Sequence, residues 1–170
     1  TFSGDFYFTR HDFFLPGRGL SVDLTFTYRS KSAYNGLFGY GWDLNYNRRL
    51  RKLADGNSDG LFDGMVLLTG DNRKDEFTWT GTAYVTPSGI YATLTDNGNG
   101  THTLTSRGGL KETFDLNGNL SQIQDRNGNT LTFTYQGPVP IQGSSDYFVN
   151  QTTGVIAQTY RITQITDSAG

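Results

Sequence analysis

The chain has 170 residues, of which 35% are hydrophobic, 14% aromatic and 18% charged, so it has enough large side chains for a folded core. A net charge of -2 offers no basic field for nucleic acid or for an anionic membrane, and no apolar run approaches the roughly 20 residues of a membrane helix. The absence of cysteine excludes disulfides and thiol chemistry.

Alternation of apolar and polar residues dominates the chain and predicts strands, with no convincing helix. The clearest strands are 20–28, 42–46 and 131–135, each with one buried and one solvated face. Further strands are predicted at 5–10, 65–69, 75–79, 82–86, 90–95, 101–106, 110–116, 119–124 and 159–166. Asn-Gly and Asp-Gly pairs fall between the strands and favour tight hairpin turns. The predicted fold is therefore all-β, a succession of antiparallel hairpins.

Residues 136–158 interrupt this rhythm with several prolines, glycines and serines, and they are predicted to form a loop or a long excursion. The chain opens without a methionine and stops at Gly170, so both ends are expected to be cuts through a longer protein.

The C-terminal third contains a partial internal repeat, in which residues 119–128 align with residues 161–170. Ile123 matches Ile165, Asp125 matches Asp167, and a glycine closes both stretches. Apolar, aspartate and glycine positions that recur at fixed spacing predict a stacked array of hairpins.

Residues 114–120, followed by Ile123, Asp125, 127–129 and 131–135, resemble the YD repeat of RHS proteins, which commonly runs Tyr-Asp-x-x-Gly-Arg-Leu-x-x-Ile-x-Asp-x-x-Gly. Phe114 stands where Tyr is usual, and Asn119 where Arg is usual. Upstream residues resemble the segment that opens the RHS repeat region. They are Gly4-Asp5, Asp12, Leu15-Pro16-Gly17-Arg18-Gly19-Leu20, Tyr28-Arg29-Ser30 and Gly36-Leu37-Phe38-Gly39-Tyr40-Gly41-Trp42.

The resemblance divides this single all-β segment into an opening part (1–109), a first YD-like repeat (110–135), the loop (136–158) and the start of a next repeat (159–170). RHS and YD-repeat proteins wind long β-sheet into a hollow shell. In bacterial insecticidal toxin complexes and polymorphic toxins the shell encloses a C-terminal toxin domain, and in animal teneurins a similar shell is part of a cell-surface adhesion protein. The family's self-cleaving aspartate site lies at the far end of the repeat region and has no match here, so no catalytic residue is expected.

The resemblance thus implies a curved sheet segment of an RHS-type shell in a secreted or cell-surface bacterial protein. Its partners would be the remaining repeats of the same chain and an enclosed C-terminal toxin or effector. A calcium-dependent β-module of a bacterial surface adhesin, binding glycan or protein, is the alternative, and an enzyme is a distant third.

Residues 54–64, ADGNSDGLFDG, concentrate oxygen ligands between two predicted strands. Their spacing fills loop positions 1, 3, 5, 7 and 9 and puts glycine at 6, which suits Ca²⁺. The candidate metal ligands are Asp55, Asn57, Asp59, Asp63 and the carbonyl of Leu61. Val66 stands at position 12 in place of the EF-hand glutamate, so the loop resembles the calcium hairpin of integrin propeller blades. Binding is expected to be weak, on the order of 10⁻⁴ to 10⁻³ M, and a plain polar turn is the alternative.

The other candidate sites favour structural interpretations. The glycines at 36, 39 and 41 precede a stretch from Trp42 to Leu53 that reads as strand, so they predict close backbone packing rather than a phosphate loop. The basic run at 48, 49, 51 and 52 has aspartate-rich neighbours and predicts a solvated strand face or a charge balance.

Aromatic and acidic side chains offer two further hypotheses. Tyr40, Trp42, Trp79 and Tyr84 have the rings to stack on sugars, although burial is the commoner fate. Asp12 with Asp43, or Asp75 with Glu76, would need a set separation across a cleft to act as a glycosidase pair. His11 and His102 are far apart in the sequence and lack the partners of a zinc site or a catalytic triad.

Overall fold

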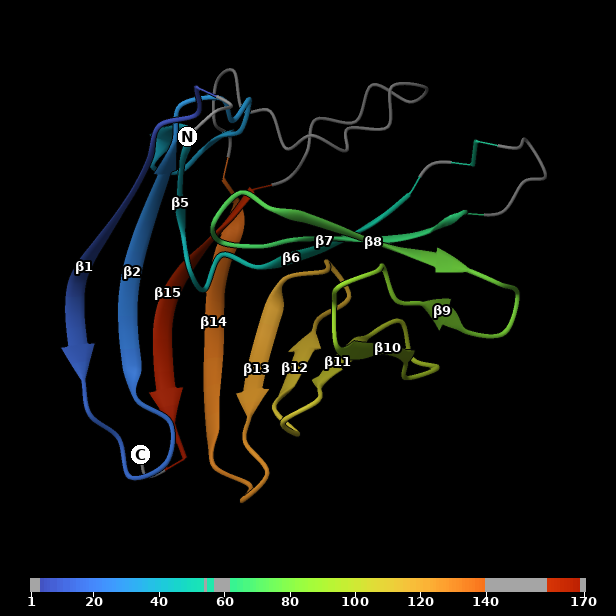
Figure 1. The fold of residues 1–170 in the computed structure, drawn as a ribbon. Coiled ribbons are helices and arrows are strands. Elements are labelled where there is room, and N and C mark those ends of the chain that lie inside the picture. Colours follow the sequence, from blue (N-terminus) through green and yellow to red (C-terminus); the bar gives the residue numbers. More distant parts are fainter. Residues whose placement is uncertain (1–3, 54, 57–61, 140–158, 169–170) are drawn as a thin grey trace.

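The computed structural model of the chain describes residues 4–53, 55–56, 62–139 and 159–168. These residues form strands β1 to β15 and no helix, which confirms the all-β class and the antiparallel hairpins (Figure 1). No described segment is a helix that would cross a membrane.

The first sheet has three strands in the order β1-β2-β5. β1 (Tyr7–Leu15) pairs antiparallel with β2 (Val22–Arg29), and β2 pairs with β5 (Trp42–Leu44). A separate two-residue pair, β3 (Asn35–Gly36) with β4 (Gly39–Tyr40), lies between β2 and β5 in the chain. β1 is therefore an edge strand of its sheet.

The second sheet has the order β6-β7-β8-β9. Its strands are β6 (Arg49–Lys52), β7 (Gly64–Leu68), β8 (Lys74–Trp79) and β9 (Tyr84–Val85). Every residue of β7 is buried, because the strand is paired with β6 on one side and with β8 on the other.

The third sheet runs in chain order from β10 to β15. Its strands are β10 (Ala92–Asp96), β11 (His102–Ser106), β12 (Lys111–Phe114), β13 (Leu120–Gln124), β14 (Thr130–Val139) and β15 (Thr159–Asp167). Each strand pairs antiparallel with the next, which makes the sheet a meander of hairpins as the alternation predicts.

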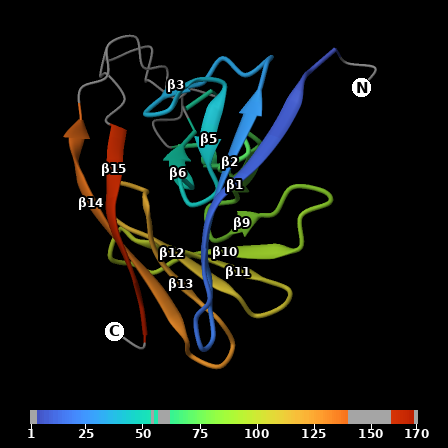
Figure 2. The ribbon, with the colours of Figure 1, turned by 90° about the vertical axis from the view of Figure 1, so that its left-hand side faces the viewer.

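One core joins the three larger sheets, and Figure 2 shows the β14–β15 hairpin and the β1-β2-β5 sheet on two sides of the molecule. The most deeply buried apolar side chains come from β7, β8 and strands β12 to β14: Phe77, Phe114, Leu67, Leu120, Leu131 and Val66. Tyr46 bridges toward the third sheet, since its ring lies 5.1 Å from that of Phe133. Apolar residues of β2 and β15 pack against this cluster from its margin.

Three predicted boundaries were wrong. β1 continues past residue 10 to Leu15, because a bulge between His11 and Phe13 shifts the register and breaks the period of two. The predicted strand 42–53 is two strands, separated by a turn in which the Asn47 N–H donates to the Leu44 carbonyl at 2.8 Å. β14 extends through 136–139, which the sequence assigned to a loop; residues 140–158 lie outside the described part.

Candidate functional site

β1 presents a large apolar surface at the edge of the first sheet. All nine of its residues are exposed, and no described strand pairs with its outer side. The large apolar residues of β1 and of the position before it are between 44% and 63% exposed: Phe6, Tyr7, Phe8, Phe13, Phe14 and Leu15. A long apolar edge of this kind is a template for pairing with another strand, and isolated proteins normally blunt it.

The inner face of β1 continues an aromatic row from β2 and β5. Phe8 meets Trp42 edge-on with ring centroids 6.2 Å apart, and the Arg10 guanidinium lies 5.5 Å from the Trp42 ring and 5.6 Å from the Phe26 ring. Arg10 also pairs with Asp12 on its own strand. These contacts hold the rings of the edge in place while leaving their outer surfaces open.

Segments that are far apart in the sequence meet around Asp5. Arg29 donates two hydrogen bonds to the Asp5 carboxylate, at 3.0 and 2.8 Å, and the Ser30 hydroxyl donates a third at 3.2 Å. The hydrogen bond from Arg29 lowers the pKa of Asp5. The Arg29 N–H donates to the Gly41 carbonyl at 2.9 Å, so three of the stretches that resemble the RHS opening segment converge here.

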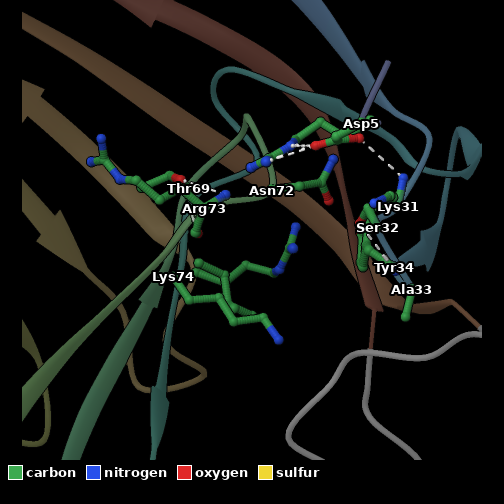
Figure 3. A pocket seen from close by; sticks show the side chains of 12 residues that line it. Asp5, Lys31, Ser32, Ala33, Tyr34, Thr69, Asn72, Arg73 and Lys74 are labelled. Carbon is green, nitrogen blue, oxygen red and sulfur yellow. Dashed lines mark hydrogen bonds and ion pairs between the residues drawn. The ribbon is translucent and has the colours of Figure 1, made fainter. Parts of the chain in front are cut away.

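A pocket of about 300 Å³ opens beside this junction, between the β1–β2 sheet and the β7–β8 turn (Figure 3). Its wall carries one carboxylate, that of Asp5, and five cationic side chains: Arg29, Lys31, Arg49, Arg73 and Lys74. All three arginines pair with a carboxylate, since Arg29 pairs with Asp5, Arg49 with Asp43 and Arg73 with Asp75. We therefore interpret the pocket as a gap between two sheets that is lined by structural ion pairs.

Asp43 forms a buried polar centre with its neighbours. Its carboxylate accepts hydrogen bonds from the Asn47 amide at 2.6 Å, the Leu44 N–H at 2.9 Å and the Arg49 guanidinium at 3.3 Å. The Arg49 guanidinium also stacks 4.5 Å from the centroid of the Tyr34 ring. Burial raises the pKa of Asp43, and the three donors act against that shift. The pair links β5 to β6.

Two turns of the third sheet share one pattern, Asp-x-Asn-Gly-Asn, at residues 115–119 and 125–129. In each turn the aspartate accepts hydrogen bonds from the backbone N–H groups two and four positions later, at 2.8 to 2.9 Å. The glycines Gly118 and Gly128 adopt φ of 72° and 88°. The aspartate and the glycine of the pattern thus build each turn, since the carboxylate accepts hydrogen bonds from exposed amides and the glycine permits positive φ.

The two turns differ in what they contact. The first lies against β6, where the Leu50 N–H donates to the Gly118 carbonyl at 2.7 Å and the Leu120 N–H donates to the Arg48 carbonyl at 3.2 Å. The second lies beside the β1–β2 turn, and a Cβ added to Gly19 would sit 2.1 Å from Asn129. The two turns therefore contact different parts of the chain, β6 and the β1–β2 turn.

The comparison with known families bears on the first half of this structure. The profile of a family described as Domain of unknown function (DUF6531) matches residues 1–77. No curated protein matches the chain.

The DUF6531 match spans β1 to most of β8, and so it contains the apolar edge, the Asp5 junction and the Asp43 centre. It ends before the two Asp-x-Asn-Gly-Asn turns of the third sheet.

The predicted calcium loop is described only at its two ends. Asn57, Asp59 and Leu61 lie outside the described residues, and Asp55 and Asp63 lie within them. The Asp63 carboxylate accepts a hydrogen bond from the Gly56 N–H at 2.8 Å, which ties the two ends of the loop together. The described residues contain no cluster of three acidic, histidine or cysteine side chains that would hold a metal. The calcium site stays a prediction.

The basic run divides between the two predicted roles. Arg49 is buried against Asp43, and Arg48 donates to Glu112 at 2.8 Å, which confirms charge balance for both. Lys52 is exposed, as a solvated strand face requires. Arg51 has a role that the sequence did not indicate, because its guanidinium donates to the Asn117 carbonyl at 2.9 Å.

The glycine, aromatic and histidine predictions have mixed outcomes. Close packing is confirmed at Gly41, where an added Cβ would lie 2.5 Å from the Arg29 carbonyl oxygen, and it was wrong at Gly39, where nothing lies within 4 Å. The predicted burial of Tyr40 was wrong, since this residue of β4 is 68% exposed. Trp42, Trp79 and Tyr84 are half-buried. His102 is buried with its Nε2 3.3 Å from the Tyr84 hydroxyl, whereas His11 is exposed beside Thr25 and Asp23.

The carboxylates proposed as glycosidase pairs have other partners. Asp12 pairs with Arg10, Asp43 with Arg49 and Asp75 with Arg73, while Glu76 is exposed on β8. These ion pairs give the three aspartates structural roles and supply no support for a cleft between paired acids.

Proposed function

We propose that the chain is a non-catalytic structural segment of an RHS-type β-shell, which encloses or presents a C-terminal toxin or effector domain in a secreted or cell-surface bacterial protein. The observation that carries this proposal is the open apolar edge at β1. Exposed aromatic side chains on both faces of an unpaired edge favour a strand that is completed by further β-sheet.

The turns of the third sheet support the same function. The Asp-x-Asn-Gly-Asn pattern recurs after ten residues, and each copy closes a hairpin that pairs with the next. β15 pairs with β14 alone among the described strands, so this sheet also ends in an edge at which a further hairpin would add. A sheet that grows hairpin by hairpin is suited to forming a long wall.

The residues that carry the family resemblance support a structural role. Asp5, Arg29 and Gly41 connect to one another, and Asp115 and Asp125 hold turns. The carboxylates of Asp5, Asp115 and Asp125 accept hydrogen bonds from neighbouring groups. This use of the motif favours a scaffold over a catalyst.

We further propose that Ca²⁺ stiffens the loop at 54–64. The loop joins β6 to β7, and β7 is buried along its whole length, so an ion there would brace a central hairpin. The carboxylates of Asp55 and Asp63 offer hard oxygen ligands. Asp63 uses one oxygen for the Gly56 N–H, and its other oxygen is suited to a cation.

Cryo-electron microscopy of the full-length protein that carries this chain tests the shell. The expected result is a hollow β-wall in which β1 is hydrogen-bonded to another strand and Phe13 and Phe14 are covered. A free-standing module with β1 open to solvent would contradict the proposal and favour the adhesin alternative.

A further inference from the structure

A groove of about 410 Å³ lies between strands of the second sheet and strands of the third sheet. Residues from the loop before β7 and from β6, β7, β8, β9, β10 and β11 contribute to it. Its chemically distinctive lining residues are Lys52, Phe62, Trp79, Tyr84, Asp96 and His102. The volume falls in the range of roughly 300–1,000 Å³ that small-ligand pockets occupy.

The aromatic wall of the groove is held in place by its own contacts. The Trp79 and Tyr84 rings lie 4.7 Å apart at an interplanar angle of 53°. The Tyr84 hydroxyl lies 3.3 Å from Nε2 of the buried His102. Rings fixed in this way lose little conformational freedom when a ligand binds, which lowers the entropic cost of binding.

Phe62 completes the apolar part at the rim. Its side chain is 52% exposed, and the Lys52 ammonium lies 4.5 Å from its ring centroid. An ammonium already occupies one face of this ring, so the groove is a poor cage for a second cation.

The polar groups of the groove are balanced in charge. Lys52 is exposed and forms no ion pair with the described residues. Asp96 is exposed, and its Oδ1 accepts a hydrogen bond from the Gly98 N–H at 2.8 Å. With one positive and one negative side chain at the opening, the groove favours neither anions nor cations.

We propose that this groove binds a neutral sugar unit of a glycan. A pyranose ring has an apolar face, which suits the Trp79, Tyr84 and Phe62 surfaces, and hydroxyl groups at its edge, which need donors and acceptors. Lys52 supplies donors and Asp96 supplies acceptors for those hydroxyl groups. A purely apolar ligand would leave these polar groups unpaired.

Tryptophan fluorescence tests the site, because the chain contains only Trp42 and Trp79. The Trp42→Phe variant is titrated with methyl glycosides and β-linked disaccharides of glucose, galactose, mannose and N-acetylglucosamine. We expect a saturable change for at least one sugar. Phe62→Ala in the same background is expected to weaken binding roughly tenfold, the factor that a loss of about 1.4 kcal/mol produces.

The matched control is Tyr91→Ala, which removes an aromatic side chain that is 73% exposed and does not line the groove. It should leave the dissociation constant unchanged, and circular dichroism confirms that each variant is folded. The proposal is overturned if no sugar gives a saturable signal, or if Phe62→Ala and Tyr91→Ala bind equally well. Saturation by an apolar dye without competition from any sugar would also overturn it, because the groove would then fit a protein side chain.

Discussion

Replacing Gly118 with alanine tests whether the first Asp-x-Asn-Gly-Asn turn packs against β6. Gly128→Ala in the second turn is the matched control. Both glycines adopt positive φ, 72° and 88°, in turns of the same sequence pattern. An added Cβ at Gly118 would lie 2.0 Å from the Leu50 carbonyl oxygen, whereas at Gly128 nothing lies within 4 Å. The strain of positive φ is shared, and the collision with β6 is confined to Gly118.

The expected free-energy costs follow from these contacts. An alanine at positive φ costs about 1 kcal/mol relative to glycine, and this is the whole effect expected for Gly128→Ala. At Gly118 the turn must also move away from β6, which breaks the hydrogen bonds from Leu50 to Gly118 and from Leu120 to Arg48. At about 1 kcal/mol each, these losses bring the expected cost to about 3 kcal/mol.

Urea unfolding followed by circular dichroism measures both variants under the same conditions. The difference between them should be about 2 kcal/mol with an unchanged dependence on urea, since the folded state is locally rearranged rather than expanded. Equal destabilisation by the two substitutions would refute the claim that the first turn is fastened to β6.

Three other predictions concern the ion pair, a turn carboxylate and the metal. Arg49→Met should cost about 3–5 kcal/mol in urea unfolding, because it leaves Asp43 buried without its guanidinium, and adding Asp43→Asn should recover part of that loss; a cost under about 1 kcal/mol would contradict the buried pair. The Asn129 amide, aided by backbone N–H groups, lowers the pKa of Asp125, so its contribution to stability is fully present above the ordinary aspartate pKa. That contribution should fall as the pH drops below about 4, and Asp125→Asn should flatten this part of the stability profile. Millimolar Ca²⁺, but not Mg²⁺, should raise the melting midpoint, and Asp59→Ala should abolish the shift; superimposable melting curves would make the loop a plain turn.

Local pattern was sufficient to predict most of the fold. Alternation in 20–28 and 131–135 depends on neighbouring residues alone, and β2 and β14 form there. The alternation failed to predict the full length of β1, where the strand contains one extra residue. Asp12 is skipped in the pairing of β1 with β2, so the sequence period breaks although the strand continues.

The alternation predicted neither which polar side chains are buried nor which distant segments are in contact. Asp43 and Asn47 gave no sequence signal of their burial with Arg49, because a buried polar group is defined by its partners. The ten-residue spacing between Asp115 and Asp125 was available in the sequence and marks the two equivalent turns. That one of them would lie against Leu50 depends on tertiary structure.

The sequence did not indicate that β1 would be the exposed apolar edge. Phe13 and Phe14 are residues that normally predict a core, and neither is covered by the described chain. Burial of such side chains depends on whether a neighbouring strand is present, which composition cannot show.

Amide hydrogen exchange of residues 7–15, measured in this chain and in the longer protein that we propose carries it, tests the shell most directly. In the isolated chain, the outward N–H groups of β1 should exchange quickly, because no described strand pairs with them. In the longer protein the same amides should be protected by several orders of magnitude, since a further strand would cover the edge. Equally rapid exchange in both proteins would contradict a role for β1 inside a continuous β-shell.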